Sequence, residues 1–222
     1  MKLHYNTVSK ELQSSLNILM NAEEFKPFRL VGGTALSLQL GHRMSVDIDL
    51  FSDNEYKSID FNCIDDYLRR TFDYVDSPST GEVAMGKSYY FGSSKDECVK
   101  LDLYYTDPFI ENALILDNIR LATVSEIAAM KVDVVQRGGR KKDFWDLHQL
   151  FEKFSIEELL HLHEQRYPYT HERNEVLTMF TNFSIADCDF DPICLFQKQW
   201  ELIKLDIVEQ IEQYQNCIAV KP

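Results

Sequence analysis

The order of apolar and polar residues changes its period along the chain, and each period predicts a different element. Apolar residues at every third or fourth position form one face of a helix, whereas strict alternation is typical of a strand with one buried face. The helical period is found at residues 8–22, 59–71, 125–137 and 141–154. Strands are predicted at residues 28–31, 46–50, 83–91 and 99–104, and residues 155–222 are helical in pattern.

The order of these elements predicts the fold class. Strands and helices mix in the first part of the chain, and only helices follow. We therefore expect an α/β (α+β) fold, in which a small, mixed and twisted sheet has flanking helices and a helical C-terminal part. A chain of 222 residues is long enough for two small domains. We predict one at residues 1–140, around the sheet, and a helical region at residues 141–222 that closes the cleft.

The composition is that of a globular protein. Hydrophobic residues make up 45% of the chain and charged residues 27%, which excludes a disordered chain, collagen and a simple coiled coil. No apolar run approaches the roughly 18–20 residues of a membrane span, and the first residues do not resemble a secretory signal. Five cysteines without a C-x-x-C pair argue against a disulfide framework. We expect a cytoplasmic protein without a membrane partner.

The charge of the chain limits its partners. Its net charge is −13, from 36 acidic and 23 basic residues, and such a chain repels nucleic acid on average. Any contact with RNA must therefore use a local basic patch. Residues 131–142 contain five basic groups against Asp133 alone, whereas residues 151–222 hold thirteen acidic and six basic groups.

Asp47 and Asp49 are the first candidates for chemistry. Residues i and i+2 of a strand point to the same face, so both carboxylates face one side while Val46, Ile48 and Leu50 face the core. Neighbouring carboxylates repel each other unless a cation lies between them, and hard oxygen ligands suit Mg²⁺. By itself the pair is better explained by a polar strand face in solvent.

A third carboxylate strengthens the metal hypothesis. Asp102 alternates with Val99, Leu101 and Leu103, so it also leaves its strand on the polar face, beside Lys100. A neighbouring strand would bring Asp102 to the same metals as Asp47 and Asp49. The sequence therefore predicts a metal site made of three aspartates.

Gly32-Gly33-Thr34 lies between a predicted strand and a short helix at residues 35–40, which Gly41 ends. Glycines allow the backbone to approach a phosphate closely, and a helix N-terminus offers unpaired N–H groups. A plain strand-to-helix turn explains the same residues. The segment is thus a candidate phosphate site.

Two charged residues lie where their helices should be apolar. Lys131 falls within the apolar arc of helix 125–137, and Asp143 falls within the arc of the next helix. Such residues are rarely buried unless they are paired. The alternatives are that the lysine side chain extends to solvent and that the aspartate stabilises a helix N-terminus.

Two stretches resemble a known family. Val31 to Leu36, followed by Gly41 to Phe51 with its Asp-x-Asp, resembles the first motif of the AbiEii/AbiGii toxin family. That family belongs to the DNA polymerase β-type nucleotidyltransferase superfamily, whose signature also has a third carboxylate on a later strand. Ser125 to Leu147 is similar to the family's Lys…Arg…Lys-Asp-x-x-Asp-Leu segment.

The resemblance implies roles for these residues. A nucleoside triphosphate would react with an acceptor hydroxyl in residues 1–140, the catalytic domain, with two Mg²⁺ ions held by Asp47, Asp49 and Asp102. Lys131 would neutralise the leaving group. Asp143 would position Lys131, and Asp146 is the alternative for that role. The phosphates would be bound by Gly32, Gly33, Thr34, Lys131 and Arg137. His42 and Arg43 lie in the motif, and a structural role explains them as well as a catalytic one.

The resemblance also implies a toxin of a toxin–antitoxin pair that adds nucleotides to tRNA, with a cognate antitoxin as partner. The acidic residues 151–222 are a poor surface for RNA. They leave open an acceptor that is a protein or a small molecule. A protein that binds nucleotide without turnover is the remaining alternative.

Overall fold

The computed structural model describes residues 2–77 and 84–219. The chain forms two compact units, Met1–Thr123 and Val124–Pro222. The division falls at the start of a helix, whereas the sequence places a domain boundary near residue 140. The roles assigned to the two predicted domains stay predictions.

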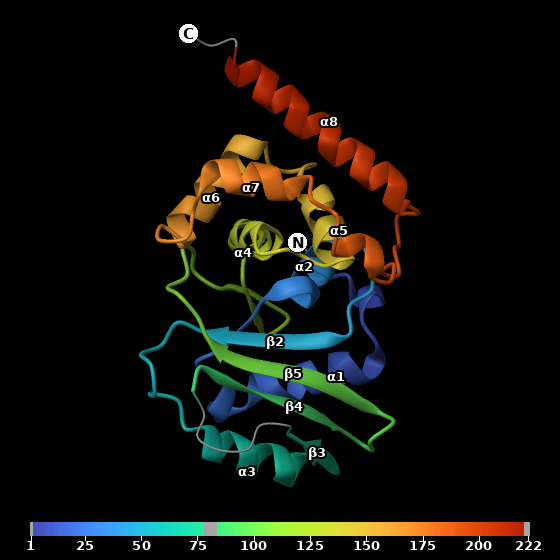
Figure 1. Ribbon diagram of the computed structural model, residues 1–222. Helices are drawn as coiled ribbons and strands as arrows, with labels where there is room; N and C mark the ends of the chain where they lie inside the picture. The colour runs from blue at the N-terminus through green and yellow to red at the C-terminus, as the bar shows by residue number, and fades with distance from the viewer. Residues whose placement is uncertain (1, 78–83, 220–222) are drawn as a thin grey trace. The chain divides into compact units, whose positions relative to one another are not determined.

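The first unit is built around a mixed sheet, in which the described residues form seven strands in the order β3-β4-β5-β2-β1-β7-β6. The strands are β1 (Arg29–Leu30), β2 (Asp47–Ser52), β3 (Tyr74–Asp76), β4 (Gly86–Gly92), β5 (Cys98–Tyr105), β6 (Leu114–Leu116) and β7 (Ile119–Leu121). β2 is parallel to β5 and antiparallel to β1. Figure 1 shows β2, β5 and β4 side by side.

Helices cover this sheet. They are α1 (Lys10–Asn21), α2 (Gly32–Leu40) and α3 (Phe61–Thr71), with short 3-10 helices at Tyr5–Thr7 and Glu23–Phe25. Ser9 caps α1 by accepting the Leu12 N–H at 3.1 Å, and the Asp60 carboxylate caps α3. α1 packs on β2, β5 and β7 through buried leucines. The predicted helices 8–22 and 59–71 are therefore present.

β2 and β5 keep the predicted alternation of buried and polar positions. Ile48, Leu50, Leu101 and Leu103 are fully buried. The residues between them, Asp47, Asp49, Lys100 and Asp102, are half-buried on the other face of the sheet. Burial of the aliphatic face thus fixes which way the acidic side chains point.

Two predictions, one for the residue before β2 and one for the start of α2, need correction. Val46 precedes β2 and is 69% exposed, so it does not face the core. α2 begins at Gly32 and not after Thr34, because the extended Val31 directly precedes its first turn. Gly41 follows the last residue of α2 with a φ of 73°, as its predicted role requires.

The second unit is helical. It contains α4 (Val124–Gln136), α5 (Lys141–Leu150), α6 (Ile156–Arg166), α7 (Arg173–Phe180), α8 (Trp200–Ala219) and a 3-10 helix at Ala186–Cys188. α4 packs against α5, α6 and α7. α8 buries the predicted face of Trp200, Ile203, Ile207 and Ile211.

Short elements and helix ends differ from the prediction. β3, β6 and β7 have three residues each, too few to show a period. α5 ends at Leu150 and not at 154, and much of 181–199 is loop where the pattern predicts helix. The predicted strand 83–91 is present from Gly86, and residue 83 lies outside the described residues.

The cysteines and the helices also bear on the sequence predictions. All five cysteines are free thiols. Within residues 2–77 and 84–219, no helix has the length and apolar character needed to cross a membrane.

Candidate active site

The pairing of β2 with β5 brings the three predicted metal ligands onto one face. In this parallel pair Asp47 is opposite Lys100, and Asp49 is opposite Asp102. All four side chains point away from the aliphatic face and are half-buried. Two strands that are far apart in the sequence thus form a cluster of three carboxylates and one ammonium group, which we call the β2–β5 cluster.

Asp102 is held from two sides. The Ser88 hydroxyl on β4 donates to Asp102 Oδ1 at 2.6 Å, and the Lys100 ammonium forms an ion pair with Oδ2. Burial alone lowers the pKa of Lys100, but the hydrogen bond to Asp102 and the charges of Asp47 and Asp49 outweigh it and raise that pKa. Lys100 is therefore cationic at neutral pH.

The donor chemistry of the β2–β5 cluster fits a hard divalent cation, since three carboxylates lie on one face of adjacent strands. Within the described part of the chain, however, no three His, Cys, Asp or Glu side chains converge as a ready-made metal site. Asp102 is engaged by Ser88 and Lys100 instead. The three aspartates suit a divalent cation in their donor atoms and in the sheet face they share. Binding of such an ion requires these side chains to rearrange.

The two glycines at the start of α2 lie against charged side chains. A Cβ on Gly32, whose φ is 66°, would lie 2.5 Å from Asp49 Oδ2, and a Cβ on Gly33 would lie 2.5 Å from a guanidinium nitrogen of Arg43. The left-handed backbone at Gly32 therefore favours glycine, whereas a side chain at Gly33 would require the Arg43 guanidinium to move. The first turn of α2 lies directly beside one carboxylate of the β2–β5 cluster.

Thr34 is turned inward. It is only 1% exposed, and its hydroxyl lies 2.8 Å from Ser45 Oγ and within hydrogen-bond distance of the Asp47 carbonyl. The hydroxyl thus fixes the start of β2.

His42 and Arg43 are also buried, at 1% and 2% exposure. Arg43 Nη1 donates to the Met44 carbonyl at 2.9 Å, and its other terminal nitrogen lies beside Gly33. These contacts favour the structural explanation for Arg43, which holds the turn that follows α2.

Lys131 lies within the second unit, between two carboxylates. Its Nζ is 2.6 Å from Asp143 Oδ1 and 2.7 Å from Asp146 Oδ2, and all three side chains are buried. The sequence left open which aspartate is the partner, and both contact the lysine. The apolar arc around Lys131 therefore hides a buried ion triad that joins α4 to α5.

The basic turn at 137–142 is partly neutralised. Arg137, a predicted phosphate ligand, is paired with Asp133. Lys141 Nζ lies 2.8 Å from Asp191 Oδ1 and 5.4 Å from the centre of the Trp200 ring. Two of its four basic side chains are thus committed to carboxylates of the same unit.

Sequence reasoning missed a buried ion pair in the second unit. Arg166 Nη1 on α6 lies 2.5 Å from Glu126 Oε1 on α4, and neither side chain is exposed. Burial of Glu126 is not foreseeable from its own position, because its partner is forty positions away on another helix. Lys100 did have a signal, since it lies two residues before Asp102 on the same strand face.

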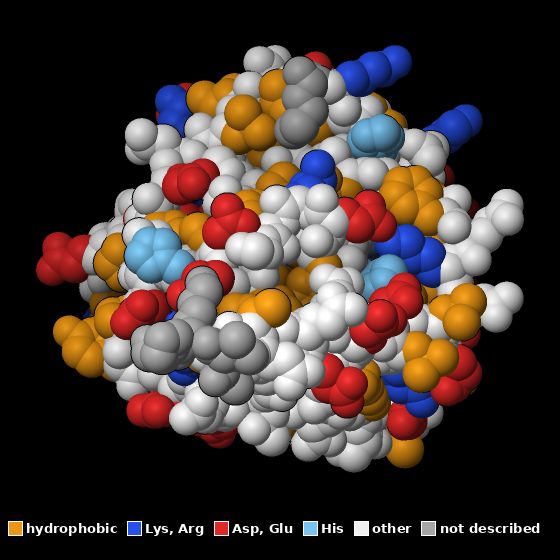
Figure 2. Space-filling view, turned by 90° about the horizontal axis from the view of Figure 1, so that it is seen from above, with side chains coloured by type: hydrophobic (Ala, Val, Ile, Leu, Met, Phe, Trp, Pro, Cys, Tyr) orange, Lys and Arg blue, Asp and Glu red, His pale blue; other side chains and the backbone are white. Residues whose placement is uncertain are grey.

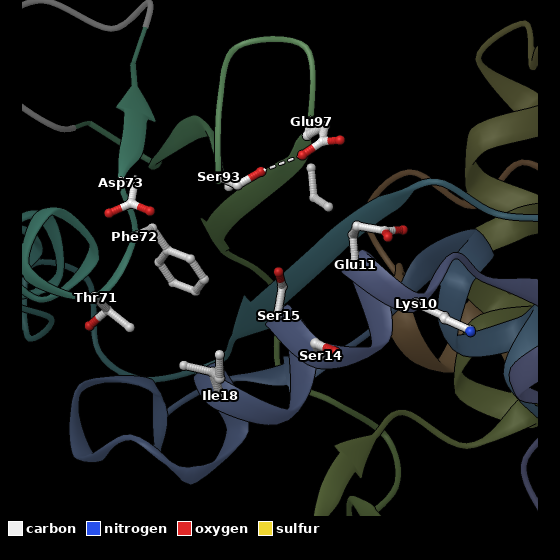
Figure 3. Close-up of a pocket in the computed structure, with 12 residues that line it drawn as sticks. Lys10, Glu11, Ser14, Ser15, Ile18, Thr71, Phe72, Asp73, Ser93 and Glu97 are labelled. Carbon is white, nitrogen blue, oxygen red and sulfur yellow. Dashed lines mark hydrogen bonds between the residues drawn. The ribbon is translucent and has the colours of Figure 1, made fainter.

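A separate hollow of about 360 Å³ lies on the first unit, between α1, the end of α3 and the turn from β4 to β5 (Figure 3). Ile18, Phe72 and Val99 supply apolar surface, and Ser93 donates to Glu97 at 2.8 Å. None of its lining residues belongs to the β2–β5 cluster. Its carboxylates are Glu11, Asp73 and Glu97, which do not share a strand face, so the hollow does not match the predicted chemistry.

Comparison with known proteins identifies a family. The model of a family described as the nucleotidyl transferase AbiEii toxin of type IV toxin–antitoxin systems matches residues 15–219. A protein of Aquifex aeolicus (strain VF5), described as uncharacterized, is 29% identical over 171 residues, which are 72% of this chain and 76% of that protein.

Solved structures confirm the nucleotidyltransferase-type fold that the sequence predicts. JHP933 from Helicobacter pylori has a TM-score of 0.58 at 18% identity, and the match covers 97% of this chain and 100% of that one. MenT4, a nucleotidyltransferase toxin from Mycobacterium tuberculosis H37Rv, has a TM-score of 0.53 at 14% identity and covers 89% and 84%. At these identities the likeness shows the fold.

Proposed function

This chain belongs to the AbiEii family of nucleotidyl transferase toxins from type IV toxin–antitoxin systems, and we propose that it transfers a nucleoside monophosphate from a nucleoside triphosphate to tRNA, with Mg²⁺ as cofactor. General nucleotidyl transfer follows from the family. The observation that supports the proposed site is the register of β2 and β5, which puts Asp47, Asp49 and Asp102 on one sheet face.

In the proposed reaction, an acceptor hydroxyl attacks the α-phosphorus of the triphosphate, and the bond to the departing pyrophosphate breaks. Asp47, Asp49 and Asp102 would hold two divalent cations. When bound, such ions stabilise charge on the attacking and leaving oxygens. Asp102 is also the residue that we expect to take up the proton of the hydroxyl.

The triphosphate would meet the first turn of α2. Because the Thr34 hydroxyl is used inside the protein, we propose that the backbone N–H groups of Gly33 and Thr34 bind the β- and γ-phosphates. We also propose that Lys131 and Arg137 counter the charge of the leaving group, and that Asp143 and Asp146 orient Lys131.

The acceptor and the partner are the finer parts of the proposal. The family implies a nucleoside triphosphate as substrate and an antitoxin as partner, and we propose the 3′ end of tRNA as acceptor, in the cytoplasm. The second candidate is an acceptor on a protein, which the acidic residues 151–222 favour over RNA.

One experiment separates these candidates. The protein is incubated with each labelled nucleoside triphosphate, Mg²⁺ and either total RNA or a protein lysate. We expect label in tRNA, and loss of labelling with Asp49→Asn. The matched control is Asp76→Asn, which changes an exposed aspartate on β3. Label in protein alone would replace the acceptor, whereas full activity of Asp49→Asn would overturn the site.

A further inference from the structure

Lys100 is the one basic side chain that β2 and β5 place on the carboxylate face within the described residues. It is opposite Asp47 in the parallel register and two residues before Asp102 on its own strand. Its ammonium group is paired with Asp102 Oδ2. A monovalent cation supplied by the chain itself thus lies among the groups proposed to bind divalent cations.

Without a cation, three half-buried carboxylates on one face would repel each other. Lys100 reduces this repulsion, because its positive charge lies opposite Asp47 in the register and forms an ion pair with Asp102. Ser88 completes the arrangement by donating to the other oxygen of Asp102 at 2.6 Å. Each carboxylate oxygen of Asp102 therefore already has a partner from the chain itself, and Lys100 holds the oxygen for which a metal ion would compete.

We propose that Lys100 is a built-in counter-ion of the β2–β5 cluster, which holds Asp102 in the metal-free protein and which a divalent cation must displace. The proposal rests on the function proposed above. It explains why the three aspartates share a face without converging on one point. Lys100 would then set how tightly the protein binds metal and would keep the metal-free sheet stable.

The test compares Mg²⁺ binding by calorimetry in the unmodified protein and in Lys100→Met. Loss of the competing charge should tighten Mg²⁺ binding by about two- to fivefold, the size expected for a partly exposed charge interaction. The matched control is Lys87→Met on β4, which removes a lysine paired with Asp65 at 2.9 Å outside the cluster. That variant should bind Mg²⁺ as the unmodified protein does.

Thermal unfolding gives a second readout. Metal-free Lys100→Met should unfold at a lower temperature than Lys87→Met, and Mg²⁺ should restore more of its stability. Lys100→Arg keeps the charge, so its metal affinity should stay close to that of the unmodified protein. Equal Mg²⁺ affinity in Lys100→Met and the unmodified protein would overturn the proposal.

A third measurement does not depend on the folding of Lys100→Met. In the ¹H–¹⁵N spectrum of the lysine ammonium groups, the Lys100 signal, assigned by its loss in Lys100→Arg, should shift on addition of Mg²⁺ while that of Lys87 stays. An unchanged Lys100 signal under saturating Mg²⁺ would show that the metal ion does not displace Lys100, and it would overturn this proposal while the proposed metal site stands. If the unmodified protein binds no Mg²⁺ with or without a triphosphate, the metal site of the proposed function falls as well.

Discussion

At the scale of single residues, backbone conformation decides which side chains the site tolerates. Gly32 combines a φ of 66° with close approach to the Asp49 carboxylate, so an alanine there meets two penalties at once. Thr34 shows the opposite case, because its hydroxyl serves the fold while its main chain stays part of the first helical turn. Neighbouring positions of the Gly32-Gly33-Thr34 segment are thus constrained for different reasons, Gly32 by its backbone conformation and Thr34 by its side-chain hydrogen bonds.

Gly32→Ala should lower the free energy of unfolding by about 1–3 kcal/mol, the usual penalty of a left-handed backbone for a residue with a Cβ. It should also displace Asp49 and abolish nucleotidyl transfer. The control is Gly41→Ala, whose φ of 73° carries the same strain away from Asp49. Urea denaturation and Mg²⁺ calorimetry of both variants check this, and normal Mg²⁺ binding by Gly32→Ala would contradict it.

Lys131 shows how a contact changes a prediction. From the sequence alone, Lys131→Met should leave stability unchanged. The structure reverses this expectation, because the variant leaves Asp143 and Asp146 buried without their shared cation. We expect a loss of about 3–5 kcal/mol in the free energy of unfolding.

Removing the two carboxylate charges together with the lysine tests this explanation of Lys131. If the stranded carboxylates cause the loss, Lys131→Met combined with Asp143→Asn and Asp146→Asn should recover part of it in urea denaturation. Nucleotide affinity is then compared between that triple variant and one with the two asparagines alone. An unaffected free energy of unfolding in Lys131→Met would show that the triad does not stabilise the fold.

At the scale of elements, periodicity identified the long segments and failed at short ones. The alternation over β2 and β5 predicted which residues are buried, and it put Asp47, Asp49 and Asp102 on polar faces. It gave no signal for β3, β6 and β7, because three residues show no period. The predicted start of α2 was wrong because glycines are common in turns between elements. Here Gly32 and Gly33 form the first turn of the helix itself.

Two helices of the second unit are joined by the Glu126–Arg166 pair, which no pattern predicts. Arg166→Met should destabilise the protein by about 3–5 kcal/mol, since it removes the cation that pairs with the fully buried Glu126 carboxylate. Arg173→Met is the control, because its pair with Glu157 is largely exposed and such pairs contribute at most about 1 kcal/mol. Similar midpoints for both variants in urea denaturation would show that burial of the Glu126–Arg166 pair does not increase its contribution to stability.

His148 on α5 predicts a loss of stability in mild acid. Burial lowers its pKa below the usual value, and the Lys198 ammonium, 3.2 Å from Nδ1, adds to this against the opposing carboxylate of Asp206. The unfolded chain therefore binds a proton at His148 at a higher pH than the folded chain. Stability should fall as the pH drops below about 6.5 and through the folded pKa.

His148→Gln should weaken that loss of stability, measured by urea denaturation at about pH 7.5 and about pH 5.5. His161→Gln, a change at an exposed histidine of α6, should leave the acid sensitivity as it is. His171 has a pKa that burial also lowers, so part of the dependence should persist in His148→Gln. Identical pH profiles for all three proteins would exclude His148 as the cause.

At the scale of the whole molecule, the site depends on pairings that sequence reasoning expects only in outline. The residue pattern singled out the three aspartates and Lys131, and the resemblance gave the fold and assigned those residues roles that stay predictions. Neither gave the pairing of Lys100 with Asp102, or of Arg137 with Asp133. Those contacts depend on side chains meeting across or along elements, which a linear pattern does not determine.

The surface charge opposes contact with RNA. The chain carries a net charge of −13, and Figure 2 shows acidic side chains scattered over one face, with the basic ones apart from each other. The basic turn at 137–142 is weaker than its sequence indicates, because Arg137 and Lys141 are each paired with an aspartate. The tRNA binding that we propose should therefore use few phosphate contacts.

This limit gives a quantitative prediction for RNA binding. Because Arg137 and Lys141 are each held by an aspartate, this turn should neutralise fewer phosphates than its four basic residues indicate, and the log–log slope of the affinity against salt should be shallower than about −4. Fluorescence anisotropy with labelled tRNA at several salt concentrations measures it. Arg140→Gln with Lys142→Gln should remove most of the slope, whereas a change of the exposed Lys57 and Lys95 to glutamine should not. A slope of about −4 or steeper would mean that other basic residues bind the RNA, and the turn would lose its assigned role.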